Sequence, residues 1–273
     1  MAWEATTDVD HESQLRGKDI NYRHSMSMRR NDMHDLYKKN ELAFALLWIA
    51  VYCAVTMSLR GQFGDESIYL LLSLAAMAAV IGLWMKKYDL QGKYGLNTWP
   101  KGSKKYLYFL PMCFLATGNL WNGIAPAYGG LAQLWACLSM LLIGIIEEVI
   151  FRGFLFKALV PRDGLLKSIV IVAVTFGMGH IINLLTGQGG PETVAQIIFA
   201  VAWGFMFTIV FYKSKSLWPC ILIHGFINAS SKYGIETTNI LWIYIIATAV
   251  ISAAYCTYLL KLKDETEPSE DRD

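Results

Sequence analysis

The chain has 273 residues, of which 55% are hydrophobic and only 17% are charged, and its mean hydropathy is +0.36. This balance is too apolar and too poor in charge for an ordinary soluble domain, so it indicates a polytopic membrane protein. The formal net charge of +2 gives no broadly basic surface, and nucleic acid is therefore not an expected partner.

The first 40 residues are polar and contain no apolar stretch of the kind found in a cleavable signal peptide. We expect residues 1–40 to form a flexible arm on the cytoplasmic side, and the first apolar run to direct membrane insertion. The last residues, 263–273, read KDETEPSEDRD and are predicted to form a short acidic disordered tail.

Between these ends lie eight apolar runs, each about 17 to 25 residues long and so able to cross a hydrocarbon core as a helix. They cover residues 42–59, 67–85, 106–122, 131–156, 166–186, 194–212, 217–234 and 239–260. The sequence therefore predicts an all-α membrane protein with about eight transmembrane helices, in a single domain over residues 41–262.

The distribution of lysine and arginine predicts the orientation of these runs. With the amino terminus inside, only Arg60 and Lys232 lie at the outer side, and the other basic residues that flank the runs lie at the inner side. Loops rich in lysine and arginine stay in the cytoplasm, so both termini are expected there. The basic and aromatic loop 86–105 could lie on anionic lipid, or could be an ordinary solvated loop.

Ionisable groups inside a membrane are costly and point to function by default. The only acidic residues well inside the apolar runs are Glu147 and Glu148, and the only histidines there are His180 and His224. Two acids and two histidines are thus the candidate chemical groups of the membrane domain.

These groups belong to three short patterns. Glu147, Glu148 and Arg152 read EExxxR, FGMGH holds an FxxxH pattern that ends at His180, and HGFIN holds HxxxN, which begins at His224. Residues four apart share a helix face, so Glu148 and Arg152 are expected to form an ion pair. Glu147 lies about 100° further around the helix and escapes that pairing. It is expected to be the freer carboxylate.

A carboxylate next to an imidazole can hold a water molecule and take its proton. A second imidazole and an amide N–H can donate hydrogen bonds to the oxyanion that forms when a carbonyl group is attacked. The patterns therefore predict hydrolysis of a peptide bond inside a membrane.

The ordered set EExxxR, FxxxH and HxxxN on consecutive apolar runs resembles the CPBP family, also called Abi, of CAAX-prenyl-protease and bacteriocin-processing intramembrane proteases. The resemblance covers roughly residues 105–235, and it implies an eight-helix fold with an active site open to the cytoplasm. It also implies roles: Glu147 as general base, His180 holding the attacking water, and His224 with Asn228 as the oxyanion hole. Glu148, Arg152 and Phe176 would support the site.

Two alternatives stay open for the chemistry. Glu147, His180 and His224 could supply the ligands of a catalytic zinc ion, although no HExxH pattern occurs. If Glu147 were a ligand, Glu148 would have to act as the base, yet Glu148 is the acid expected to pair with Arg152. A glutamate mechanism without a metal is therefore favoured over a zinc site.

Two non-proteolytic functions also fit the patterns. The polar groups could only hold helices together in a membrane scaffold that regulates a sensor kinase or confers immunity to a secreted peptide. They could also form a proton or solute pathway, although the repeated halves of many transporters are absent from the sequence. As a protease, the chain would act on CAAX-type peptides, bacteriocin leaders, signalling precursors or other membrane-associated segments. No sequence feature predicts an oligomeric state.

Overall fold

The structure is a computed structural model that describes residues 33–186, 189–235 and 237–263. The predicted acidic tail, apart from its first residue, and most of the predicted amino-terminal arm therefore lie outside the described residues. The chain divides into two compact units, Met1–Phe44 and Ala45–Asp273. In the described part of the first unit, residues 33–39 and 41–44 are helical. The second unit holds every residue of the candidate site.

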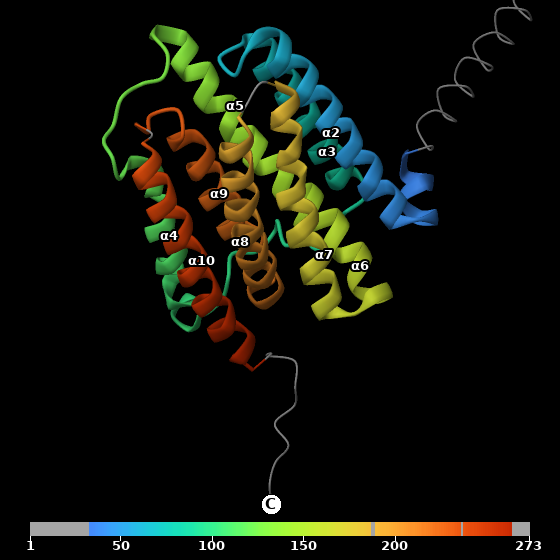
Figure 1. Ribbon diagram of the computed structural model, residues 1–273. Helices are drawn as coiled ribbons and strands as arrows, with labels where there is room; N and C mark the ends of the chain where they lie inside the picture. Colours follow the sequence, from blue (N-terminus) through green and yellow to red (C-terminus); the bar gives the residue numbers. More distant parts are fainter. Residues whose placement is uncertain (1–32, 187–188, 236, 264–273) are drawn as a thin grey trace, which may run out of the picture. The chain divides into compact units, whose positions relative to one another are not determined.

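The described chain is built from helices, without strands (Figure 1). Six helical segments are long and apolar enough to cross a membrane by length and composition. They are Glu41–Phe63, Ile68–Lys87, Gly130–Asp163, Leu165–Leu184, Gly190–Ser214 and Ile240–Lys261. Many leucine, isoleucine and valine side chains on these helices are exposed, as expected of surfaces that face lipid. The all-α membrane fold class is confirmed at this level.

The helices, in chain order, are labelled in Figure 1. They are α2 (Glu41–Phe63), α3 (Ile68–Lys87), α4 (Leu110–Ala116), α5 (Gly130–Glu148), α6 (Phe156–Asp163), α7 (Leu165–Met178), α8 (Gly190–Ser214), α9 (Trp218–Ser230) and α10 (Thr238–Lys261). Short 3₁₀ segments cover Ser103–Phe109, Gly118–Leu120 and Gly179–Thr186, and a π-helical segment, Val149–Leu155, joins α5 to α6.

Two of the eight expected spans correspond to short helices. The third run contains α4, with seven residues, and the seventh contains α9, with 13 residues, which is about 20 Å of helix. Both are shorter than a hydrocarbon core of roughly 30 Å. The count of eight spans therefore stays a prediction, beside the six long segments that the described residues contain.

Proline positions explain where several of these helices begin. Pro111, Pro191 and Pro219 each lie at one of the first two positions of α4, α8 and α9. The first turn of a helix has no partner for its N–H groups, so proline fits there without breaking a hydrogen bond. Pro111 and Pro219 therefore interrupt no hydrogen bond within α4 or α9.

The second unit has two distinct ends. At one end, which we call the lysine-rich end, the loop after α3 bonds to the turn between α8 and α9: Gly95 O accepts from Leu217 N at 3.0 Å, and Thr98 O accepts from the Ser216 hydroxyl at 2.7 Å. Lys213 Nζ donates to Leu262 O at 2.7 Å, which brings the end of α10 to the same place. This end lies low in Figure 1.

At the opposite end, which we call the Asp65 end, three chain segments meet. Asp65 accepts hydrogen bonds from Arg60 Nε at 2.6 Å and from Lys232 Nζ at 2.7 Å. The segment before α5 pairs with the end of α9 through Ala125 N and Tyr233 O at 2.8 Å. The carboxyl end of α2, the loop before α5 and the turn after α9 are thereby joined.

Candidate active site

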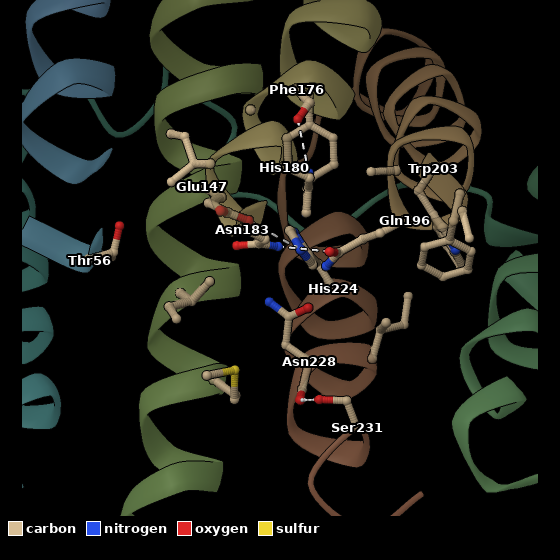
Figure 2. A pocket seen from close by; sticks show the side chains of 18 of the residues that line it. Thr56, Glu147, Phe176, His180, Asn183, Gln196, Trp203, His224, Asn228 and Ser231 are labelled. Carbon is tan, nitrogen blue, oxygen red and sulfur yellow. Dashed lines mark hydrogen bonds and ion pairs between the residues drawn. The ribbon is translucent and has the colours of Figure 1, made fainter. Parts of the chain in front are cut away.

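The residues of the three sequence patterns come from three neighbouring parts of the second unit. Glu147 and Glu148 end α5, and Arg152 lies in the π-helical segment that follows. Phe176 lies near the end of α7, and His180 follows in the 3₁₀ segment Gly179–Thr186. A third set, His224 and Asn228, lies on α9. Figure 2 shows Glu147, Phe176, His180, His224 and Asn228 around one pocket.

A close crossing of two helices brings the acids to His224. A Cβ atom added to Gly144 on α5 would lie 2.8 Å from the backbone nitrogen of Gly225 on α9 and 2.9 Å from its Cα. Small residues at such a crossing let two helix backbones approach closely. Because Gly225 follows His224 directly, this contact places the imidazole beside the end of α5.

Glu148 is the centre of a fully buried polar network. Its Oε1 accepts a hydrogen bond from Arg152 Nη1 at 2.8 Å and another from Nδ1 of His224 at 2.8 Å. The side chains of Glu148 and Arg152 have no exposed surface, and that of His224 is 7% exposed. The ion pair expected from the four-residue spacing is present, and it also fixes His224.

Two aromatic rings hold the guanidinium group of Arg152. Its Cζ lies 4.2 Å from the ring centroid of Phe176 and 5.3 Å from that of Phe207. A cation over the face of an aromatic ring is attracted by the ring quadrupole, more strongly where water is excluded. Phe176 also meets His180 and His224 edge to face, with centroids 5.5 and 5.6 Å away. The phenylalanine of the FxxxH pattern thus packs against all three basic groups.

Glu147 has different partners. Its Oε1 accepts a hydrogen bond from the Tyr52 hydroxyl at 2.6 Å, and its Oε2 lies 3.4 Å from Nε2 of His224. Its side chain is 13% exposed, whereas Glu148 is fully buried. The expectation that Glu147 lies apart from Arg152 agrees with these contacts. Glu147 is nevertheless a bonded carboxylate, because it bridges Tyr52 on α2 and His224 on α9.

The hydrogen-bond partners indicate where protons lie on the two imidazoles. A carbonyl oxygen can only accept, so Nδ1 of His180, which lies 3.2 Å from Phe176 O, carries a proton and leaves Nε2 for another partner. Nδ1 of His224 likewise donates to Glu148. If Nε2 of His224 is also protonated, the charges of Glu147, Glu148, Arg152 and His224 sum to zero. Such a balance suits a site buried in a membrane domain.

The cavity beside these groups has a volume of about 510 Å³. Glu147, His180, His224 and Asn228 all line it, together with Tyr52 and polar residues from other helices. Asn183 Nδ2 donates to Gln196 Oε1 at 2.7 Å on its wall. Within the described residues, the side chains of His180 and Asn228 make no hydrogen bond to those of Glu147 or His224. The four residues predicted to be catalytic, Glu147, His180, His224 and Asn228, therefore share one cavity, and among them the close side-chain polar contact is that of Glu147 with His224.

Three residues of this site lie outside the sequence patterns. Tyr52 contacts Glu147 from α2, Phe207 stacks on His224 with centroids 5.4 Å apart, and Trp203 lines the cavity from α8. A tyrosine in an apolar run carries a hydroxyl that needs a partner when buried, and this is the one signal that pointed to Tyr52. Phenylalanine and tryptophan in such runs give no comparable signal.

The described residues do not form a cluster of metal ligands. Among them, no three histidine, cysteine, aspartate or glutamate side chains group closely enough to hold one ion. Glu147 and His224 face each other, and the hydrogen bond of His180 Nδ1 to the Phe176 carbonyl group leaves its Nε2 available, but the three side chains do not converge on one point. The suggested ligand set Glu147, His180 and His224 therefore does not fit a bound metal in this arrangement.

Comparison of the sequence with models of known protein families gives one match. Residues 130–230, which contain all three sequence patterns, match the family model described as type II CAAX prenyl endopeptidase Rce1-like. These residues, which we call the Rce1-like segment, are similar to that family. The resemblance to the CPBP and CAAX proteases is thereby confirmed. No curated protein and no solved structure matches the chain.

The Rce1-like segment begins with α5 and ends with α9, so it contains the buried Glu148 network and the wall of the cavity from Met140 to Asn228. The family description is that of a peptidase, which supports a protease at that coarse level. Together with the apolar helices, it also indicates a multi-pass membrane protein. Tyr52, on α2, lies outside the Rce1-like segment.

Proposed function

We propose that this chain is an intramembrane endopeptidase that hydrolyses peptide bonds of membrane-associated peptides or proteins, with CAAX-type or leader-type substrates. The observation that carries the proposal is the contact of 3.4 Å between Glu147 and His224 at the wall of a cavity that His180 and Asn228 also line. The Rce1-like match over the same residues supports the reaction class.

In this proposal the chain supplies a base and a holder for the attacking water. Glu147 takes a proton from the water as its oxygen bonds to the carbonyl carbon of the peptide. Nε2 of His180, which is directed away from the Phe176 carbonyl group, accepts a hydrogen bond from the water's other O–H, and that hydrogen stays on the oxygen. When the C–N bond breaks, Glu147 returns its proton to the leaving nitrogen.

The developing oxyanion would be stabilised from α9. Nε2–H of a protonated His224 and the side-chain amide of Asn228, one helical turn further on, donate to it. The Glu148 carboxylate fixes the imidazole by accepting from Nδ1, and Arg152 with Phe176 fixes Glu148. Glu148, Arg152 and Phe176 are thus positioning residues. Glu147, His180 and His224 would have to come closer together to hold a metal ion, so no step is assigned to one.

The test compares Glu147→Gln with the wild-type chain in cells and in proteoliposomes. Peptides of the membrane fraction that appear only with the wild-type chain identify a substrate, and a synthetic version of one is then used to measure cleavage. We expect the variant to lose at least about a hundredfold in kcat while it inserts and folds. The matched control is Glu192→Gln, which removes another carboxylate of the same cavity wall.

The outcomes separate the candidate functions. Unchanged cleavage in Glu147→Gln would contradict the proposed base. Biological activity that survives this substitution without any cleavage by the wild-type chain would favour the membrane scaffold, in which the buried network only joins helices. Flux of protons or solute across proteoliposomes without peptide cleavage would favour a transport pathway.

A further inference from the structure

The cavity extends from the candidate site toward one end of the second unit only. Its wall includes Arg60, Lys232 and Asn119, which lie at the Asp65 end, and Glu192 in the first turn of α8. None of the lysine and arginine residues that mark the lysine-rich end lines the cavity in the described chain. Tyr52 and His224 each lie eight positions before Arg60 and Lys232, roughly 12 Å at the rise of a helix.

Exposure to solvent rises along the same direction. The side chains of Glu148 and Arg152 are fully buried, and those of His224 and Glu147 are 7% and 13% exposed. Lys232 reaches 17% and Arg60 reaches 33%. The cavity is thus closed behind Glu148 and becomes more accessible toward the Asp65 end.

Aromatic packing closes the opposite direction. Phe151, Phe176 and Phe207 line the cavity at its inner end and are each at most 4% exposed. Beyond them, every residue of the π-helical segment Val149–Leu155 is buried. These residues separate Glu147 from Lys157 and from the rest of the lysine-rich end.

The two ends differ sharply in charge. In the described chain from Ala45 onward, the lysine and arginine side chains at the Asp65 end are Arg60 and Lys232, and both bond to Asp65. All the others lie at the lysine-rich end, apart from the buried Arg152. Basic segments next to membrane helices stay in the cytoplasm. The lysine-rich end therefore faces the cytoplasm and the Asp65 end faces the opposite side.

We propose that the catalytic cavity opens on the extracytoplasmic side of the membrane, between the ends of α2, α8 and α9. This proposal differs from the cytoplasm-facing site that the family resemblance implies. For the substrate it rests on the proposed function and narrows it to one of the two substrate types named there. The peptide reaches Glu147 from the extracytoplasmic side, so leader-type substrates and the outer ends of membrane proteins fit, and CAAX-type cytoplasmic tails do not.

The test uses cysteine labelling from one side of the membrane. Cys53 lines the cavity one residue after Tyr52 and is partly exposed, so it is retained as the probe while the other four cysteines are replaced by alanine. Two marker variants are made without Cys53: Gln62→Cys at the exposed end of α2 and Gln91→Cys in the exposed loop at the lysine-rich end. A charged, membrane-impermeant methanethiosulfonate reagent is applied to intact and to permeabilised cells.

We expect Cys53 and the Gln62→Cys marker to react in intact cells, and the Gln91→Cys marker to react only after permeabilisation. Reaction of Cys53 only together with Gln91→Cys would show that the cavity opens at the lysine-rich end and would overturn the proposal. Reaction of Gln91→Cys in intact cells would overturn the orientation, and absence of Cys53 labelling in both preparations would overturn the open cavity.

The labelling does not depend on catalysis, so the two proposals can fail separately. A chain that labels as expected but cleaves no membrane peptide would contradict the proposed function alone. A chain whose Glu147-dependent cleavage occurs only when the substrate is on the cytoplasmic face of proteoliposomes would contradict the extracytoplasmic opening alone.

Discussion

The Tyr52 hydroxyl donates a hydrogen bond of 2.6 Å to Oε1 of Glu147, although 95 residues separate them in the sequence. Tyr52 is 7% exposed, so this bond lies largely away from water. A hydrogen bond to a charged group contributes about 1.5 to 3 kcal/mol. We expect Tyr52→Phe to lower kcat by roughly ten- to a hundredfold with little change in KM, because the ring stays and only the donor is lost.

Tyr244→Phe is the matched control for this variant. Tyr244 also lines the cavity, but its hydroxyl donates to Leu115 O at 2.7 Å and not to Glu147. A role of Tyr52 in positioning Glu147 predicts that only Tyr52→Phe loses turnover while both variants unfold at similar temperatures. Equal losses of kcat in the two variants would mean that Tyr52 acts through packing.

Substitution of Arg152 should lower the free energy of unfolding of the protein. Arg152→Met leaves the fully buried Glu148 with His224 as its remaining partner. Breaking one side of a buried ion pair costs about 3 to 5 kcal/mol, because the other charge stays buried. Thermal unfolding in detergent should show this loss, and Glu148→Gln combined with Arg152→Met should lose less than the two single variants added together. Strict additivity would argue against a coupled network.

The crossing of α5 and α9 gives a third prediction. Gly144→Ala would bring a Cβ atom to 2.8 Å from the Gly225 backbone, so one helix must move. Overpacking of this kind costs about 1 to 3 kcal/mol. Since the same crossing sets the distance from Glu147 to His224, kcat should also fall. Gly61→Ala, where an added Cβ meets nothing within 4 Å, should change neither quantity.

The Asp65 end should be sensitive to acid. Burial raises the pKa of Asp65, but hydrogen bonds and charges from Arg60 and Lys232 outweigh it and hold the pKa below the ordinary value of 3.8. Because the folded state lowers the pKa, the ionised carboxylate stabilises the fold above the ordinary pKa. This contribution is lost as the pH falls through the lower, folded-state pKa.

Asp65→Asn should therefore lower stability near neutral pH and flatten the fall in unfolding temperature between about pH 5 and about pH 3. Glu66→Gln is the control, since Glu66 bonds to Tyr128. An Asp65→Asn chain that keeps the full acid sensitivity of the wild type would show that the ion pairs with Arg60 and Lys232 do not control it.

Metal dependence has a direct test. The described site groups no three metal ligands, and the proposed chemistry uses Glu147 as a base. We expect cleavage to be unchanged after the protein is treated with a chelator and the chelator is then removed, together with any metal that it has bound. Loss of cleavage that zinc restores, together with stoichiometric zinc in the purified active protein, would instead support ligation by Glu147, His180 and His224 after rearrangement.

The local spacing of polar residues predicted the part of the site that lies on single helices. Glu148 and Arg152 pair as four-residue spacing requires, and the rarity of charge in apolar runs selected Glu147, His180 and His224. Both signals depend only on residues close in sequence or on composition. The all-helical membrane fold followed from the same apolar runs.

Contacts between distant helices were not predictable in this way. The Tyr52 bond to Glu147 and the stacking of Phe207 on His224 depend on which helix faces meet, and many faces of an apolar helix look alike. The direction of the cavity depends on how three helix ends are spaced. Hydropathy also could not reveal that α4 and α9 are short, because apolar residues continue into the adjoining 3₁₀ segments and turns.

The π-helical segment Val149–Leu155 restricts which insertions and deletions the chain can accept. Each of its turns holds more residues than an α-helical turn, so it sets the angular phase between the face of α5 that carries Glu147 and the face of α6 that follows. Deletion of one residue between Glu148 and Arg152 would leave them three positions apart and would turn Arg152 away from the rings of Phe176 and Phe207 that hold it. The number of residues between Glu148 and α6 is therefore as constrained as the identity of the two glutamates, and insertions or deletions in this interval should be excluded from any active variant.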